Sequence, residues 1–148
     1  MATTELTQNE SGESSGKRGK RLHIGLWVAQ GLMGVAFLLA GLGHLAQPME
    51  QLQAQNPWIS GTMGQFVRFI GAVEVLGGLG MILPSATRIK PFLTPLAALG
   101  LTTVMVLAAL THAARGEFFM LPLNLVLGGL TAFVAWGRWR KAPIAPRA

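Results

Sequence analysis

The stretch QFVRFIGAVEVLGGLGMIL, residues 65–83, decides the fold because it is long and apolar enough to cross a membrane as a helix. It nevertheless carries two charged residues, Arg68 and Glu74, inside the apolar run. A charge at the depth of a bilayer costs about 2.5 to 3.5 kcal/mol on insertion scales, so such residues seldom face lipid. We therefore predict that both side chains face partners from elsewhere in the chain.

Three glycines surround Glu74 at helical spacing. Gly71 lies three residues before it, and Gly77 and Gly78 lie three and four residues after it. These spacings place all four residues on one helical face, where small residues let a neighbouring backbone approach closely. Arg68 lies six residues earlier, which is about 120° around the helix, so it does not pair with Glu74 within the helix.

The composition of the whole chain also indicates a membrane protein. Of 148 residues, 51% are hydrophobic and only 12% are charged, whereas soluble domains have about 25% charged residues. The chain has no cysteine, which excludes dithiol exchange, iron–sulfur clusters and thiolate zinc sites within it. The net charge of +6 comes from basic residues that flank apolar stretches, so we predict a lipid bilayer as partner and no nucleic acid.

The apolar stretches predict an all-α membrane protein with one domain, residues 22–137, between a disordered polar and basic tail (1–21) and a basic tail (138–148). Short links between the helices favour an antiparallel bundle. We expect the second helix to end at Pro84 and part of the loop 46–63 to form a short surface helix. The four transmembrane helices are predicted at about 22–45, 65–83, 92–112 and 118–136.

The basic residues predict the orientation of the bundle. Only Arg68 and Arg115 belong to one side of the membrane. The positive-inside rule places the opposite side, with both termini, in the cytoplasm. The cytoplasmic group is Lys17, Arg18, Lys20, Arg21, Arg88, Lys90, Arg138, Arg140, Lys141 and Arg147.

This orientation places the remaining polar residues at the outer ends of all four helices. We expect the inner, cytoplasmic half of the bundle to contain only Leu, Val, Ala, Gly and Met. In one interpretation the outer polar residues form a structural network, in which Arg68 and Arg115 neutralise Glu74 and Glu117. In the other they form a polar pocket for a ligand or a redox group. The candidates are His44, Arg68, Glu74, His112, Arg115, Glu117 and Asn124.

Specific chemistries receive little support from motifs. Desolvation raises the pKa of a carboxyl group, so a protonated Glu74 could handle protons. His44, His112 and Glu74 are residue types that bind metals, but no close ligand spacing supports a site, and we predict no metal. Neither a nucleotide-binding fingerprint nor a catalytic triad is present, which leaves open whether the chain is an enzyme.

Polar residues stand in a distinctive arrangement in the Arg-Phe-Ile-Gly…Glu-x-x-Gly pattern of the second helix and in the His-x-x-Arg-x-Glu turn after the third. They belong to four longer blocks, which are AFLLAGLGHLAQP (36–48), RFIGAVEVLGGLGMILP (68–84), LTPLAALGLTTVMVLAALTHAARGE (93–117) and PLNLVLGGLTAFVAWGR (122–138). Over about residues 26–137, these blocks resemble the DoxX-like family of four-helix integral membrane proteins.

The resemblance implies a bacterial inner-membrane protein. The family takes its name from a subunit of a thiosulfate:quinone oxidoreductase, and other members are linked to membrane complexes of oxidative stress. It therefore implies an accessory or quinone-interacting component of a membrane redox system, with redox subunits as partners and quinone as the suggested cofactor. In this hypothesis Arg68, Glu74, His44 and His112 line an outward-facing polar pocket. The alternatives are a non-enzymatic assembly or scaffold subunit and a small-solute transporter.

Overall fold

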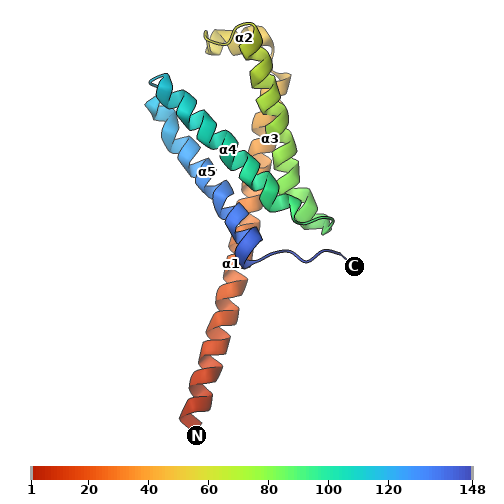
Figure 1. The fold of residues 1–148 in the computed structure, drawn as a ribbon, viewed down its shortest axis with the longest axis vertical. Coiled ribbons are helices and arrows are strands. Elements are labelled where there is room, and N and C mark those ends of the chain that lie inside the picture. Colours follow the sequence, from red (N-terminus) through yellow and green to blue (C-terminus); the bar gives the residue numbers. More distant parts are fainter. Residues whose placement is uncertain (1, 148) are drawn as a thin grey trace.

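The computed structural model describes residues 2–147, with side chains for residues 16–147, and every regular element in this part of the chain is a helix (Figure 1). The longest element, α1, is continuous over 45 residues. The elements are α1 (Ala2–Ala46), α2 (Met49–Gln55), α3 (Thr62–Thr87), α4 (Leu93–Ala114), the 3₁₀ turn η1 (Phe118–Met120), α5 (Leu121–Trp136) and the π-helical turn η2 (Gly137–Lys141).

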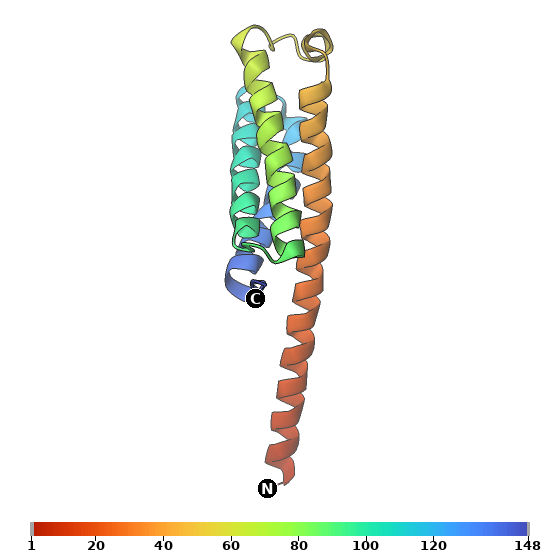
Figure 2. The ribbon, with the colours of Figure 1, turned by 90° about the vertical axis from the view of Figure 1, so that its right-hand side faces the viewer.

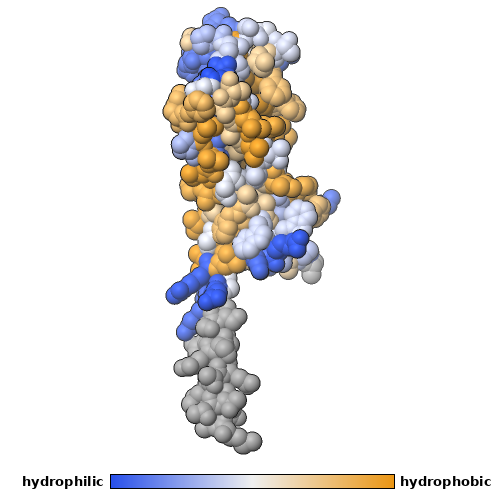
Figure 3. All heavy atoms as spheres, turned by 60° about the vertical axis from the view of Figure 1, so that its left-hand side comes forward, coloured by the Kyte–Doolittle hydropathy of each residue, from blue (hydrophilic) through white to orange (hydrophobic). Residues whose placement is uncertain are grey.

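Within the described residues, four helical segments are long and apolar enough to cross a membrane, which confirms the prediction of an all-helical protein with four such helices. Figure 3 shows one face of the bundle, which carries a hydrophobic band with hydrophilic side chains beyond it at each end. Large apolar residues such as Leu76 and Leu125 are more than two-thirds exposed, as lipid-facing side chains of a membrane protein should be. The segments are Gly16–Ala46, Thr62–Thr87, Leu93–Ala114 and Phe118–Lys141.

The helices pack in two close pairs that share one core. α1 packs along α3 and α4 along α5, while α3 also contacts α4, and α1 contacts α5 (Figure 2). The core between them contains Phe37, Met81, Leu101, Met105 and Val134. Methionine fills irregular space well because its side chain is unbranched and flexible.

The helix α1 differs from the expected disordered tail at 1–21, because it already begins at Ala2. Helix propagation adds one hydrogen bond for each residue that it orders, so a stable apolar segment can extend into a polar one. Residues 1 and 148, at the ends of the two predicted tails, lie outside the described residues.

The prediction that the second span ends at Pro84 is wrong, because α3 continues through this proline to Thr87. Proline removes one backbone donor, but transmembrane helices tolerate it where neighbouring groups satisfy the freed carbonyl. Arg88, the residue after Thr87, has φ 59° and ends the helix in the left-handed conformation. Ser85 then donates a hydrogen bond of 2.7 Å to Thr94, which joins α3 to α4.

The two polar segments that follow the first and last spans both contain helix. The loop 46–63 contains α2, which agrees with the short helix expected there, and its position on a membrane surface stays a prediction. The basic segment 138–148 begins within η2, where Arg138 is buried rather than part of an exposed tail.

Candidate functional site: polar groups at both ends of the bundle

The predicted residue Glu74 finds its partner on the first helix. Its Oε2 lies 2.7 Å from Nδ1 of His44, so the contact joins α3 to α1. The carboxylate side chain is only 6% exposed, whereas the histidine side chain is 39% exposed. A buried carboxylate thus has a hydrogen-bond partner that itself reaches the surface of the bundle.

Glycine on both helices allows this contact. A Cβ added to Gly41 of α1 would lie 2.5 Å from the carbonyl oxygen of Gly71 and 2.9 Å from Cβ of Glu74. α1 and α3 also approach closely further from His44, where a Cβ on Gly78 would lie 2.6 Å from the carbonyl oxygen of Gly34. Small residues at these positions let the two backbones approach, as the spacing around Glu74 predicted.

The network interpretation predicted that Arg68 neutralises Glu74. Instead, Arg68 binds the end of α1. Its Nη1 donates to the carbonyl oxygen of Leu45, and its Nη2 donates to that of Gln47 at 3.3 Å. The last carbonyl groups of a helix lack intrahelical donors, which makes them good acceptors for a guanidinium group. Arg68 therefore fixes the chain where α1 gives way to the loop.

A second group of polar residues forms at the turn between α4 and η1. Glu117 accepts hydrogen bonds from Nε of Arg115 at 2.9 Å, and its other oxygen lies 2.7 Å from Nδ1 of His112. The hydrogen bond from Arg115, followed by that of His112, holds the pKa of Glu117 below its usual value. The pairing of Arg115 with Glu117 agrees with the predicted network.

A tryptophan, Trp58, connects this turn to the loop before α3. The guanidinium carbon of Arg115 lies 4.2 Å from the ring centre of Trp58, a cation–π contact. The predicted residues thus form two hydrogen-bonded groups, His44–Glu74 with Arg68 nearby on α3, and His112–Arg115–Glu117. Trp58 connects the second group to the α2–α3 loop.

Asn124 lies apart from the hydrogen bonds of both groups. It is buried on the face of α5 that also buries Gly128 and Thr131. Its Nδ2 has no hydrogen-bond partner among the described residues. Thr131 receives a hydrogen bond of 2.9 Å from Thr102 and so joins α5 to α4.

The opposite end of the bundle holds a buried polar group, so the expectation of a wholly apolar inner half is wrong. Arg138 is 3% exposed and Gln30 is fully buried. Nε of Arg138 donates to Oε1 of Gln30 at 2.9 Å, and Nε2 of Gln30 donates to the carbonyl oxygen of Met81 at 2.6 Å. Arg138 also lies over the ring of Trp27, with 5.0 Å to its centre.

Sequence reasoning missed this group because Arg138 stands among basic residues that explain orientation. The signal that could have revealed it is Gln30, an amide in the middle of an apolar span. A buried amide needs hydrogen-bond partners, so its presence predicts a polar contact between helices.

The seven candidate residues line neither of two cavities in the bundle. One cavity lies beside Arg138 and the other lies between α3 and α4. Within the described part of the chain, no group of three or more His, Cys, Asp or Glu residues could hold a metal ion.

Comparison with known proteins identifies a family. The sequence model of a family described as the DoxX-like family matches residues 28–134, which is most of the chain. Neither the curated proteins nor the solved structures contain a match.

Proposed function

Because the chain belongs to the DoxX-like family, we propose that it is an accessory component of a membrane redox system and that its His44–Glu74 pair exchanges protons. The contact of 2.7 Å between a half-exposed imidazole and a buried carboxylate carries this proposal. An imidazole changes its charge near neutral pH, and a carboxylate beside it can accept or return the proton. The pair would pass protons between the surface and the interface of α1 and α3.

The proposal includes an antiparallel bundle in an inner membrane with both termini in the cytoplasm. The short connections between consecutive spans support the antiparallel arrangement. The uneven distribution of Lys and Arg supports the orientation. His44 would then face the outer side.

The cavities beside Arg138 and between α3 and α4 are not lined by the predicted residues. Both terminal nitrogens of Arg68 already donate to the carbonyl oxygens of Leu45 and Gln47, and Arg115 contacts Glu117 and Trp58. Quinone would therefore meet the chain at its lipid-facing surface or beside a partner subunit. The proton exchange proposed for His44 and Glu74 does not depend on it.

A second candidate is the non-enzymatic scaffold, and the contacts of Arg68 favour it. They tie α3 to the end of α1, a role that needs no ligand. In this reading the His44–Glu74 hydrogen bond only fixes how the two helices pack. The transporter alternative stays a prediction without a supporting contact.

Infrared difference spectroscopy on the full chain in mild detergent separates the two candidates. Changing the pH of the wild type around neutrality should alter a carboxyl band that Glu74→Gln removes and Glu50→Gln, at an exposed position on α2, retains. A band that persists in Glu74→Gln would overturn the proton-exchange proposal. In that case, lower thermal stability of Glu74→Gln would support the scaffold.

The redox assignment needs a separate measurement. Gentle purification from native membranes should recover redox subunits together with the chain, and His44→Gln should lower the activity of that complex without releasing its subunits. Recovery of the chain without any redox subunit under conditions that preserve other membrane complexes would count against the assignment.

A further inference from the structure

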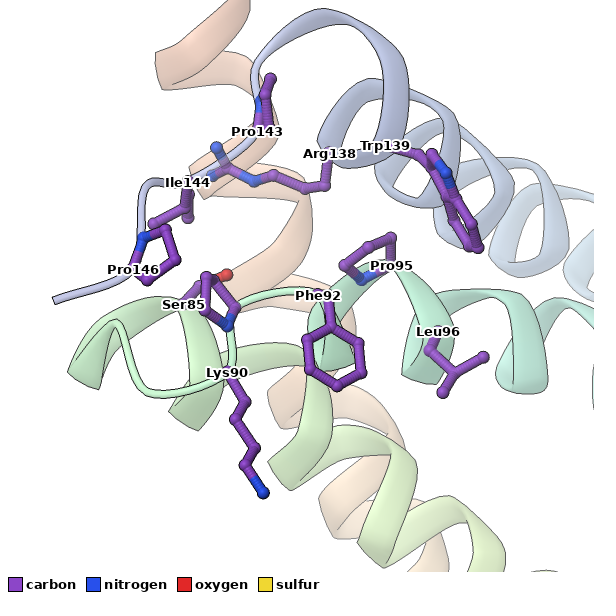
Figure 4. A pocket seen from close by; sticks show the side chains of 11 residues that line it. Ser85, Lys90, Phe92, Pro95, Leu96, Arg138, Trp139, Pro143, Ile144 and Pro146 are labelled. Carbon is purple, nitrogen blue, oxygen red and sulfur yellow. The ribbon is translucent and has the colours of Figure 1, made fainter.

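A cavity of about 680 Å³ lies where α3, α4 and the C-terminal segment meet. Figure 4 shows Phe92, Pro95 and Trp139 around it, with Arg138 and Ile144 on the side of the C-terminal segment. Its walls are almost wholly apolar, and the cationic residues that line it are Arg138 and Lys90. This size lies within the usual range of small-molecule sites, about 300 to 1,000 Å³.

The apolar wall continues onto the outer surface of the bundle. Phe92 is 62% exposed, Trp139 is 59% exposed and Leu96 is 50% exposed, although all three line the cavity. The hydrocarbon chain of a molecule whose head group lies in the cavity would therefore extend along α4 without leaving apolar surroundings. Two tryptophans, Trp136 and Trp139, stand at this end of α5 and η2, a common position at the membrane–water interface.

Arg138 supplies a buried positive charge, and none of its described partners is an anion. These partners are the amide oxygen of Gln30, the carbonyl oxygen of Ala142 at 3.3 Å, the imidazole of His23 at 3.4 Å and the ring of Trp27. Its Nη2 is buried and has no hydrogen-bond partner among the described residues. A buried guanidinium with an unused donor is costly unless an anion compensates it.

The described carboxylates do not provide this compensation. Glu74 pairs with His44, Glu117 pairs with Arg115 and His112, and both pairs belong to the outer groups. Glu50 lies on α2, next to the loop that Arg68 holds. Within residues 16–147, no described ion pair includes Arg138.

We propose that this cavity binds an acidic membrane lipid, with its phosphate head at Arg138 and an acyl chain along Phe92, Leu96 and Trp139. A guanidinium group forms charge-assisted hydrogen bonds with phosphate, and Nη2, which has no partner among the described residues, would donate to it. The Lys90 side chain extends away from the guanidinium (Figure 4), so it attracts the anion at longer range. The C-terminal segment closes the site, since the backbone N–H of Arg147 donates to the carbonyl oxygen of Arg88 at 3.0 Å.

The test uses the full chain in a mild non-ionic detergent and measures its melting temperature against added lipid. The probes are phosphatidylglycerol, phosphatidylcholine with the same acyl chains, and inorganic phosphate. A ligand that binds the folded state raises the melting temperature in a saturable way. Phosphatidylglycerol should do so, and the other two probes should have little effect at equal concentration.

Three variants locate the effect. Arg138→Gln removes the charge, and it should weaken the apparent affinity for phosphatidylglycerol by about tenfold or more. Leu96→Trp fills the cavity without changing any charge and should do the same. Leu99→Trp is the matched control, because Leu99 is 48% exposed on the same helix but does not line the cavity.

Several outcomes would overturn the proposal. An equal response to inorganic phosphate would make this a site for a free anion, and an equal response to phosphatidylcholine would remove the role of charge. If Arg138→Gln fails to fold, the comparison of Leu96→Trp with Leu99→Trp decides alone. Equal lipid responses of these two variants would then exclude the cavity as the site.

Discussion

Gly41 of α1 and Gly71 of α3 face each other so closely that neither has room for a side chain. A Cβ on Gly41 would lie 2.5 Å from the carbonyl oxygen of Gly71, and a Cβ on Gly71 would lie 2.9 Å from that of Gly41. Both atoms are backbone, so a rotamer change cannot relieve the clash. The His44–Glu74 hydrogen bond stands directly beside this crossing, because the Cβ on Gly71 would also meet Cβ of His44 at 2.8 Å.

Gly41→Ala should therefore destabilise the protein by about 1 to 3 kcal/mol, the usual cost of overpacking a closely packed contact. Gly43→Ala is the matched control, since a Cβ there meets nothing within 4 Å. Unfolding of the detergent-solubilised protein, followed by circular dichroism, measures both. Equal stability of the two variants would show that the helices can separate at this level without cost.

Removing the carboxylate of Glu74 should cost more than removing only its charge. Glu74→Ala loses the hydrogen bond to His44, at an expected cost of about 1 to 3 kcal/mol, whereas Glu74→Gln keeps an oxygen acceptor. The measurement is again the free energy of unfolding, with Glu50→Gln as a control at an exposed position. Equal losses in Glu74→Gln and Glu74→Ala would mean that charge, and not the hydrogen bond, stabilises the contact.

The turn after α4 should become less stable in acid. Hydrogen bonds from Arg115 and His112 lower the pKa of Glu117 from its ordinary value of 4.5. The unfolded state therefore takes up a proton first as the pH falls, so the contribution of Glu117 is complete above about pH 4.5 and is lost as the pH falls through the lower, folded-state pKa. The difference in melting temperature between wild type and Glu117→Gln should shrink over that interval. A difference that stays constant down to about pH 3 would contradict the lowered pKa.

Gln30→Leu should destabilise the opposite end of the bundle. It removes the acceptor of the Arg138 Nε–H and the donor to Met81, and a hydrogen bond to a charged group contributes about 1.5 to 3 kcal/mol. The double variant Gln30→Leu with Arg138→Leu should recover part of this loss, because it also removes the charge. Gln65→Leu, at an exposed position on α3, serves as the control. Additive losses in the double variant would show that Gln30 and Arg138 are not coupled.

The positions of the spans could be predicted from the sequence because hydropathy is a local property. The predicted helix at 92–112, for example, agrees with α4 at Leu93–Ala114. The sequence also showed that Glu74 faces another helix, because its glycine neighbours lie on the same face. It could not identify His44 as the partner, since that choice depends on how α1 and α3 align over a separation of 30 residues.

The two arginines that were misinterpreted show which physical information was lacking. Arg68 binds the unpaired carbonyl oxygens at the end of α1, an acceptor that every helix end provides but that hydropathy does not show. Arg138 resembles its basic neighbours in sequence and differs from them only in burial. Burial depends on tertiary packing, and only the amide of Gln30 indicated it beforehand.

The helix α1 carries both His44 and Gln30, which are 14 residues apart and thus about 21 Å apart along its axis. Each contacts α3, one through Glu74 and the other through Met81. A sliding motion of α1 by one turn, or its rotation about its own axis, would break both contacts together. The register of α1 against α3 is therefore set at two points, one near each end of the segment between Gln30 and His44.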